Sequence, residues 1–428
     1  MSSKTKATTT KAEATPSLVP KVRFPEFQDA EGWKETHLGE LCQRIMDGTH
    51  FSPKSKSGPR PYLTSKNIRD GRLDLSDLCY ISEDEHREIY KRCPVKKGDV
   101  LLTKDGANTG NCALNNLDFE FSLLSSVAVL RGDTAKVSQQ FLFQTIVSDR
   151  TRHLIEDSMS GQAITRITLE KLGKYVVPVP SVVEQQKIAE CLSSVDELMA
   201  AQSRKVDALK THKKGLMQQL FPREGETQPR LRFPEFQNAG EWEERKAGSL
   251  FTNRITKGEQ GLPIYSVTMH DGMIRRDSLD RNFYDIEEAA GNKKVCRNDI
   301  AYNMMRMWQG ALGVAPEDCL VSPAYIVLAP AKGTDPDFFQ YMFKLPTTLL
   351  LLTAYSRGLT KDRLRLYFDD FARIPLPCPS FGEQQRIADC LSSLDDLIAA
   401  QNQKLNALKT HKKALMQQLF PSPEEIES

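Results

Sequence analysis

The sequence lacks any long apolar run, which excludes an ordinary membrane-spanning helix. The longest candidate, 345–354, is shorter than the ~18–20 residues that cross a bilayer and contains proline and threonine. The N-terminus has no apolar segment of the kind that marks a secretory signal. The nine cysteines are an odd number and form no Cys-x-x-Cys pair. That pattern favours reduced thiols in a cytoplasm over disulfides or a zinc site.

A charge excess is missing as well. The 58 Lys and Arg residues nearly balance the 56 Asp and Glu residues, which leaves a net charge of +2. This excludes a protein that holds nucleic acid through a global positive field, so any such binding must use local basic surfaces. The hydrophobic fraction of 39% is typical of a globular chain. A length of 428 residues suits two or three domains at ~150 residues each.

Catalytic motifs are absent too. The sequence has no Asn-Pro-Pro-Tyr or Asp-Pro-Pro-Tyr methyltransferase motif, no phosphate-binding loop and no Gly-x-Ser-x-Gly elbow. The seven histidines show no spacing typical of metal ligands, and two of them are repeat copies beside lysines. We therefore expect no catalytic, cofactor-binding or metal-binding residue in this chain.

What the chain does have is an internal repeat. Segments 184–222 and 383–421 are identical at 29 of 39 positions, at a constant offset of 199. A shorter element repeats as PKVRFPEFQDAEGW at 20–33 and PRLRFPEFQNAGEW at 229–242. The segments between are much less alike, although landmarks recur in the same order, such as KGDV at 97–100 and RNDI at 297–300. The pattern indicates one scaffold that carries two different surfaces, built from short strands and a few helices.

The long repeated segments predict two coiled-coil helices. Apolar residues recur with alternating spacings of four and three over about five heptads. A Ser-x-x-Glu sequence at 181–184 and 380–383 predicts a capping box, and Pro222 and Pro421 end the helices. The expected seam residues are Ile188, Leu192, Val195, Gln202, Leu209, Leu216, Ile387, Leu391, Leu394, Gln401, Leu408 and Leu415.

The simplest partner for each helix is the other one. In an antiparallel pair Gln202 would meet Gln401, so facing residue numbers would sum to about 603 (202 + 401), with Ile188 near Leu415 and Leu216 near Ile387. A buried polar pair could fix this register; alternatively, both glutamines are solvated at the edge of the seam. The outer faces are copied too, as in KTHKK at 210–214 and 409–413. We interpret them as docking surfaces for two copies of one partner rather than as parts of an inert spacer.

With these features the chain resembles the specificity subunit of a type I restriction-modification enzyme. The resemblance covers nearly everything from residue 20 on. It rests on two unlike domains separated by two near-identical helices, and on a Pro-x-Pro strand end that leads into Glu-Gln-Gln-Lys/Arg-Ile-Ala at 184–189 and 383–388.

The resemblance implies an α/β fold with two target-recognition domains separated by two long, paired antiparallel helices with pseudo-two-fold, circular symmetry. The expected parts are a disordered tail (1–19), target-recognition domain 1 (20–180), conserved helix 1 (181–222), target-recognition domain 2 (223–379), conserved helix 2 (380–421) and a C-terminal tail (422–428). In a circular arrangement the RFPEF element at 23–27 should lie near the end of the second helix.

The resemblance also implies a function. The chain would be the non-catalytic DNA-specificity subunit of a bacterial or archaeal cytoplasmic complex. Each domain would read one half of a split double-stranded DNA site. Two modification (methyltransferase) subunits would dock on the chain, two restriction (endonuclease/translocase) subunits would join them, and S-adenosylmethionine would bind the modification subunits.

Loops rich in basic, amide and hydroxyl side chains are the expected places of DNA readout. The segment 52–72 carries six basic residues and one acidic residue, although an ordinary solvated loop would have the same composition. Trp308 is either a reader stacked near a base or, as we expect, part of the core together with Met304, Met305 and Met307. The candidate DNA-contacting residues are Lys66, Asn67, Arg69, Arg72, Lys104, Gln162, Thr165, Arg166, His270, Arg275, Arg276, Arg306, Arg357, Lys361 and Arg363.

Since these loops differ between the two domains, the two half-sites should differ in sequence. The length of the rigid helices predicts that the half-sites lie about one duplex turn (~34–36 Å) apart. Three alternatives stay open at this point. The chain could be a self-contained methyltransferase, a coiled-coil adaptor that binds proteins without reading DNA, or the specificity subunit of another restriction class.

Overall fold

The computed structural model describes residues 18–55, 57–159, 166–269, 271–278, 291–360 and 363–421. The chain forms two compact units. Unit 1 comprises Met1–Gln202 with Lys404–Ser428, and unit 2 comprises Ser203–Gln403. Two helices, α6 (Val182–Leu220) and α11 (Phe381–Leu419), each begin in one unit and end in the other. This division into two units does not separate the long helices from the domains. The boundaries of the six predicted segments therefore stay a prediction.

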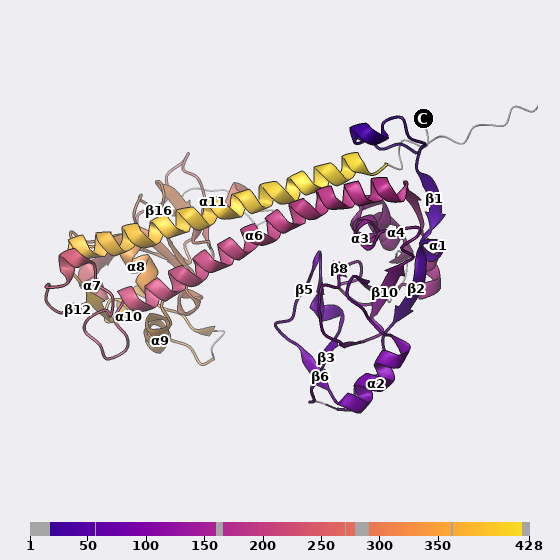
Figure 1. Ribbon diagram of the computed structural model, residues 1–428. Coiled ribbons are helices and arrows are strands. Elements are labelled where there is room, and N and C mark those ends of the chain that lie inside the picture. The colour runs from indigo at the N-terminus through magenta and orange to yellow at the C-terminus, as the bar shows by residue number, and fades with distance from the viewer. Residues whose placement is uncertain are drawn as a thin grey trace, which may run out of the picture. The chain divides into compact units, whose positions relative to one another are not determined.

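Unit 1 is built around an antiparallel sheet with strand order β2-β10-β7-β8. Strands β2, β10 and β8 of this sheet are labelled in Figure 1. Helix α3 packs against β7, β8 and β10. Smaller sheets pair β1 with β11, β4 with β5, and β3 with both β6 and β9. In chain order the elements are η1 (Pro25–Phe27), β1 (Lys34–His37), α1 (Leu38–Leu41), β2 (Cys42–Asp47), β3 (Arg60–Leu63), η2 (Ser65–Asn67), β4 (Ile68–Arg69), β5 (Arg72–Leu73), β6 (Cys79–Ile81), α2 (Glu83–Arg92), β7 (Val100–Thr103), β8 (Cys112–Leu114), β9 (Ser122–Leu123), β10 (Val127–Gly132), α3 (Gln139–Val147), α4 (Asp149–Met159), α5 (Leu169–Gly173) and β11 (Val176–Val179).

Unit 2 repeats the plan, with a central sheet of order β13-β20-β17-β18. Its smaller sheets pair β12 with β21, β14 with β15, and β16 with β19. In chain order the elements are η3 (Pro234–Phe236), β12 (Glu243–Lys246), α7 (Ala247–Leu250), β13 (Phe251–Asn253), β14 (Tyr265–Val267), β15 (Met273–Arg275), η4 (Arg276–Ser278), β16 (Lys293–Val295), β17 (Ile300–Asn303), η6 (Met307–Gln309), β18 (Leu312–Val314), β19 (Cys319–Val321), β20 (Tyr325–Pro330), α8 (Pro336–Phe343), α9 (Pro346–Ala354), α10 (Phe368–Phe371) and β21 (Pro375–Cys378). The α/β fold expected from the sequence is thus present in both units.

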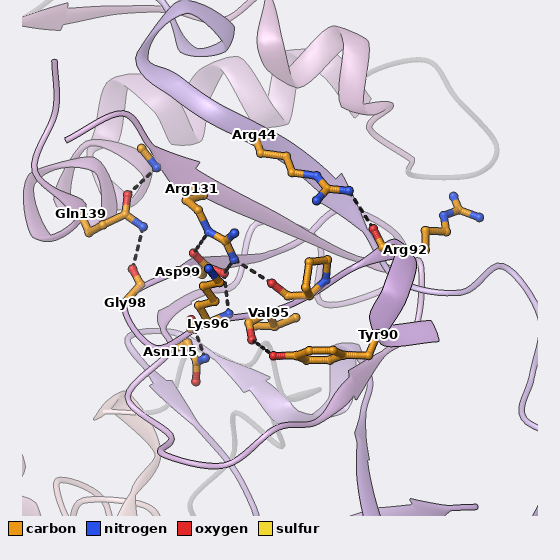
Figure 2. Close-up of polar contacts among 12 residues, drawn as sticks. Arg44, Tyr90, Arg92, Val95, Lys96, Gly98, Asp99, Asn115, Arg131 and Gln139 are labelled. Atoms are coloured by element: carbon orange, nitrogen blue, oxygen red, sulfur yellow. Dashed lines mark hydrogen bonds and ion pairs between the residues drawn. The ribbon is translucent and has the colours of Figure 1, made fainter. Parts of the chain in front are cut away.

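A buried aspartate fixes the turn before the central strand in each unit. Gly98 has φ +91° and Asn298 has φ +70°, the left-handed backbone that glycine and asparagine adopt most readily. The next residue, Asp99, accepts hydrogen bonds from the Lys96 backbone N–H (2.8 Å) and from two nitrogens of Arg131 (2.6 and 2.8 Å), as Figure 2 shows. This network holds the start of β7 and hence the strand that leads into a candidate DNA loop.

Unit 2 reaches the same result with an arginine from another strand. Asp299 accepts from the Cys296 N–H (2.9 Å) and from Arg254, which follows β13, whereas Arg131 lies on β10. The landmark common to both repeats is therefore the turn and its aspartate, while the cation that neutralises the buried carboxylate is supplied differently in each unit.

The two long helices run antiparallel within each unit. In unit 1, Lys412 of α11 forms an ion pair with Asp196 of α6 at 2.8 Å. In unit 2, Lys213 of α6 pairs with Asp395 of α11 at 2.5 Å. Both pairs sum to 608 (412 + 196 and 213 + 395). Lysine side chains on a helix point about one turn toward its N-terminus, so these pairs are compatible with the expected sum of about 603 without fixing it.

The expected seam residues lie inward. Ile188, Leu192, Val195, Ile387 and Leu391 are buried, and the remaining apolar seam residues are half-buried. Gln401 is 5% exposed and Gln202 is half-buried, so the alternative in which both glutamines are solvated is wrong for Gln401. The expected meeting of the two glutamines stays a prediction.

Each RFPEF element is attached to both long helices. The Arg23 guanidinium donates two 2.7 Å hydrogen bonds to the Glu184 carboxylate at the start of α6, and Trp33 Nε1 donates to the same carboxylate at 3.3 Å. The Val22 N–H donates to the carbonyl of Gln418 near the end of α11 (3.0 Å). This confirms the expected position of the first element near the end of the second helix.

The capping prediction is half right. The Ser181 hydroxyl accepts from the Glu184 N–H at 3.4 Å, as a capping box requires. The Glu184 side chain instead serves as the buried acceptor for Arg23 and Trp33, and Glu383 does the same for Arg232 and Trp242. The helices end at Leu220 and Leu419, before the prolines, as expected.

Two residues of the predicted tail, 18 and 19, lie within the described part of the chain. Leu18 is buried and forms an antiparallel bridge with Trp33, whose N–H donates to the Leu18 carbonyl at 2.7 Å. Apolar burial beside a tryptophan orders this point of the chain. Residues 1–17 and the predicted C-terminal tail, 422–428, lie outside the described residues. Within the described ranges, no helix combines the length and hydropathy needed to span a bilayer.

Candidate nucleic-acid interface

Three candidate loops of unit 1 meet at one edge of its central sheet. The Gly71 N–H donates to the carbonyl of Cys112, the first residue of β8 (2.8 Å), and the Asn111 side chain donates to the carbonyl of Ile68 (3.2 Å). These two bonds join 64–74 to the start of β8. Asp105 and Arg166 form an antiparallel bridge, and their side chains approach to 3.9 Å. We call 64–74, 104–111 and Arg166 the unit 1 loop cluster.

The corresponding loops of unit 2 are joined in a similar way. The Leu366 N–H donates to the carbonyl of Met304 (2.9 Å), which places 356–365 beside the loop that follows β17. Strand β15 pairs with β14 and also packs against β18, the neighbour of β17. We call the described residues of 268–278, 303–310 and 356–365 the unit 2 loop cluster.

Most of the candidate DNA-contacting residues in these clusters reach solvent, and only Arg276 is half-buried, with its Nε donating to Ser266 Oγ at 3.1 Å. The exposed ones are Lys66, Arg69, Arg72, Arg166, Arg275, Arg306, Arg357 and Arg363. Each cluster is therefore a local basic surface on a nearly neutral chain, which is the arrangement that phosphate contacts need.

Two of the candidates are structural. Asn67 is 4% exposed, its Oδ1 accepts from the Thr64 N–H (2.9 Å), and its amide donates to the carbonyls of Asp74 and Asp77. Lys104 is 2% exposed, and its Nζ lies 3.4 Å from buried Asp47. The predictions that Asn67 reads adenine and that Lys104 contacts DNA are wrong, because burial and internal partners already use these groups.

Acidic neighbours hold some of the exposed arginines. Hydrogen bonds from Ser76 and Arg69 lower the pKa of Asp74 to about 2, so this carboxylate is charged at neutral pH and pairs with Arg69 (3.3 Å). Arg357 lies 2.6 Å from Asp370, whose side chain is 9% exposed, and this hydrogen bond raises the pKa of Arg357. Arg275 pairs with Asp277 at 3.1 Å. A phosphate that approached these arginines would have to compete with the carboxylates.

Four candidates, Gln162, Thr165, His270 and Lys361, lie outside the described residues. Arg365 was not among the candidates, yet it is exposed and shares a two-residue bridge with Arg357. The sequence Arg-Leu-Arg-Leu at 363–366 gave a usable signal, because alternation puts Leu364 and Leu366 inside and Arg363 and Arg365 outside.

The aromatic and methionine predictions for 304–308 are mixed. Met307 is buried and Met304 is partly buried against the unit 2 core, as expected. Met305 is 42% exposed, so its predicted place in the core is wrong. Trp308 is half-buried and donates from Nε1 to the carbonyl of Met305 (3.0 Å), which fixes the loop.

A second kind of surface is copied in both units. In unit 1, Lys187 of α6 pairs with Glu26 (3.2 Å) and lies over the ring of Phe24 (5.8 Å). In unit 2, Arg386 of α11 pairs with Glu235 (3.1 Å) and lies over Phe233 (4.7 Å). The ends of the long helices adjoin the same elements, since the Leu231 N–H donates to the Gln219 carbonyl at 2.9 Å, as Val22 does to Gln418. We call each set the copied surface of its unit.

The chain is similar to several known proteins. A family model described as "Type I restriction modification DNA specificity domain" matches residues 30–211 and 240–410. A protein named putative type I restriction enzyme MjaX specificity subunit, from Methanocaldococcus jannaschii, is 23% identical over 407 residues, which cover 91% of this chain and 93% of that protein. The MjaVIII specificity subunit of the same organism is 25% identical over 194 residues, which cover 45% and 42% of the two chains.

One solved structure has the same fold along the whole chain. The S subunit of a type I restriction-modification system from M. genitalium aligns with a TM-score of 0.58 at 16% identity, covering 95% of this chain and 100% of that one. At this level of identity the likeness concerns the fold.

Proposed function

Since the chain belongs to the type I restriction-modification DNA specificity family, we propose that its two loop clusters read the two halves of a split, asymmetric DNA site. The observation that carries the proposal is the gathering of exposed basic residues at one sheet edge in each unit. Arg69, Arg72 and Arg166 serve this purpose in unit 1, and Arg306 and Arg363 in unit 2. Arginine is the side chain that most often reads guanine in the major groove.

The asymmetry of the site follows from the loops. Both units use the same strand order, but the residues at the sheet edge differ: Lys66, Arg72 and Arg166 on one side, and Arg306, Arg363 and Met305 on the other. Different donors at base edges select different bases. A palindromic site would require like loops on both units.

The chain supplies specificity and leaves the chemistry to other subunits. Its sequence contains no Asn-Pro-Pro-Tyr or Asp-Pro-Pro-Tyr methyltransferase motif and no phosphate-binding loop. Methyl transfer would take place on modification subunits, with S-adenosylmethionine bound there, and cleavage would belong to restriction subunits. A purified chain that methylated DNA unaided would contradict this division.

The copied surfaces are the proposed docking sites for two modification subunits. Glu26 and Lys187 on one unit correspond to Glu235 and Arg386 on the other, with a phenylalanine ring beside each pair. Because a fold needs no identical solvent-facing residues, their duplication supports a partner that binds twice.

The proposal can be tested with the complex of this chain and its modification subunit. Genome-wide mapping of methylated bases in a host that expresses both should give one bipartite site with two unlike halves. Methylation without sequence preference, or a complex that assembles but leaves DNA unmodified and unbound, would contradict DNA readout and favour a protein-binding adaptor.

Docking is tested by charge reversal on one copied surface at a time. Lys187→Glu and Arg386→Glu should each lower the stoichiometry from two modification subunits to one, measured by native mass spectrometry. Lys174→Glu, on an exposed lysine of unit 1 outside this surface, is the control and should keep two. Two bound subunits in both reversal variants would place the docking site elsewhere.

A further inference from the structure

The unit 2 loop cluster carries an unusually exposed apolar side chain. Leu359 is 99% exposed, and among the described large apolar residues the next most exposed is Phe51, at 81%. Isolated apolar residues on a surface are common and need no explanation by themselves. The position of Leu359 and the residues around it are what distinguish it.

Leu359 lies two residues after the neck of a hairpin. At the neck, Arg357 and Arg365 exchange two backbone hydrogen bonds of 2.9 Å each. Gly358 lies so close to the returning chain that a Cβ there would come within 2.6 Å of the Arg363 carbonyl oxygen. Leu364 and Leu366, on the returning arm, are buried in the unit. The arms are therefore anchored in the unit, while Leu359 itself is left in solvent.

Basic residues lie on the same hairpin and on the neighbouring loop, although Arg357 is paired with Asp370. Arg357, Arg363 and Arg365 come from the same hairpin, and Arg306 comes from the neighbouring loop, which is joined to the hairpin through Leu366 and Met304. An apolar protein partner gains little from a rim of arginines. A DNA duplex matches both features, because phosphates line the groove and the thymine C5 methyl is an apolar group exposed inside the major groove.

We propose that Leu359 is a specificity-determining residue that packs against a thymine C5 methyl in the half-site read by unit 2. This inference rests on the proposed function, because it requires that the unit 2 loop cluster lies in the major groove. It adds a base preference of apolar origin to a surface whose other candidate contacts are mainly cationic, with Met305 as a second exposed apolar side chain. Within the described part of the unit 1 loop cluster, no large apolar side chain is exposed, so the preference belongs to one half-site.

The test combines a protein change with a single-methyl change in the DNA. The complex with the modification subunit is prepared as wild type, as Leu359→Ala and as Leu350→Ala. Leu350 is 67% exposed on α9, outside the loop cluster, and is the matched control. Each thymine of the mapped site is replaced in turn by uracil, which lacks only the C5 methyl, and equilibrium affinity is measured for every pair.

At one thymine, in one half-site, uracil should weaken wild-type binding about fourfold, the amount expected for one buried methyl group. Leu359→Ala should bind the thymine duplex at least that much more weakly and show no further loss with uracil at that position. Leu350→Ala should behave as wild type throughout. Since Leu359 is fully exposed, all variants should unfold at the same temperature.

The other possible results contradict either the role of Leu359 or the proposed function. Equal sensitivity to uracil in wild type and Leu359→Ala, or a half-site without thymine, overturns this inference while the proposed function stands. A loss of affinity in Leu359→Ala that is equal for every sequence also overturns it, because the leucine would then act as a non-specific wedge. If the wild-type complex has no sequence preference, the proposed function itself fails.

Discussion

Lys104 offers a sharp test, because the sequence favours a DNA contact and the structure favours an internal ion pair. Its side chain is 2% exposed, and its Nζ lies 3.4 Å from Asp47, whose side chain is 7% exposed. The Lys104 backbone also donates to the Ser126 carbonyl and accepts from the Ile167 N–H, both at 2.9 Å. Replacing Lys104 with alanine should therefore destabilise unit 1 without touching a DNA contact.

The magnitude follows from the charge that is left behind. Removing one partner of a buried ion pair costs about 3–5 kcal/mol. Asp47 keeps a second cation, since Arg92 Nη2 lies 3.3 Å away, so we expect the lower end, about 3 kcal/mol. That corresponds to about 100-fold faster exchange of amides that exchange through opening of unit 1.

Hydrogen exchange measured by mass spectrometry gives this quantity for each unit separately. Peptides from β7 and β10 report on unit 1, and those from β17 and β20 serve as the internal reference in the same sample. Lys104→Met keeps most of the side-chain volume and separates the loss of charge from the cavity. Adding Asp47→Asn to Lys104→Met should restore part of the lost protection, because no buried carboxylate is then left without its lysine.

Arg166→Ala is the control for Lys104→Ala, because it removes an exposed cation of the same loop cluster. Arg166 is half exposed and 3.9 Å from Asp105, so its loss should change stability by less than about 0.5 kcal/mol. Unchanged exchange in Lys104→Ala, together with lost DNA preference at full stability, would refute the structural role assigned to Lys104.

Three further predictions follow from the same contacts. Arg166→Ala and Arg363→Ala should each relax the preference for one half-site, a different one in each case, as measured by methylation mapping; an effect on both halves would contradict separate readout. Matched insertion of seven residues in the middle of both α6 and α11 lengthens each helix by ~10.5 Å and should widen the gap by about three base pairs with unchanged half-sites; an unchanged gap would show that the helices do not set it. Glu383→Gln should destabilise unit 2 by about 3 kcal/mol, because Arg232 loses its buried carboxylate, and should speed exchange in β12 and β21 but not in β1 and β11; Glu184→Gln should do the reverse.

The sequence was most informative where one pattern repeats. The heptads from Ile188 and Ile387 predict long helices, and α6 and α11 span 39 residues each. The family resemblance led to the α/β fold and to the position of the first RFPEF element beside the second helix. Such features depend on residue spacing and on duplication, both of which can be read along the chain.

The site was only partly readable. Composition located the loops, but Asn67, Lys104 and exposed Met305 were assigned to the wrong environments. The same side chains have opposite roles depending on burial: an exposed lysine meets phosphate, whereas Lys104 neutralises Asp47. Burial depends on which strands become neighbours, and no local pattern carries that information.

The glutamate of the Glu-Gln-Gln motif illustrates the same limit. A local rule assigns Glu184 to a capping box, but Arg23 and Trp33, about 150 residues earlier in the chain, take both carboxylate oxygens. A buried charge gains more from a guanidinium partner than from a single backbone N–H, so the long-range contact prevails.

By itself, the sequence determined the duplicated architecture, the two long helices and the composition of each loop, because helical periodicity and repetition can be read along the chain. Tertiary structure alone decided which polar groups are buried with internal partners and which are exposed at the surface. That division is set by desolvation, which penalises every buried polar group without a partner and depends on neighbours far away in the chain.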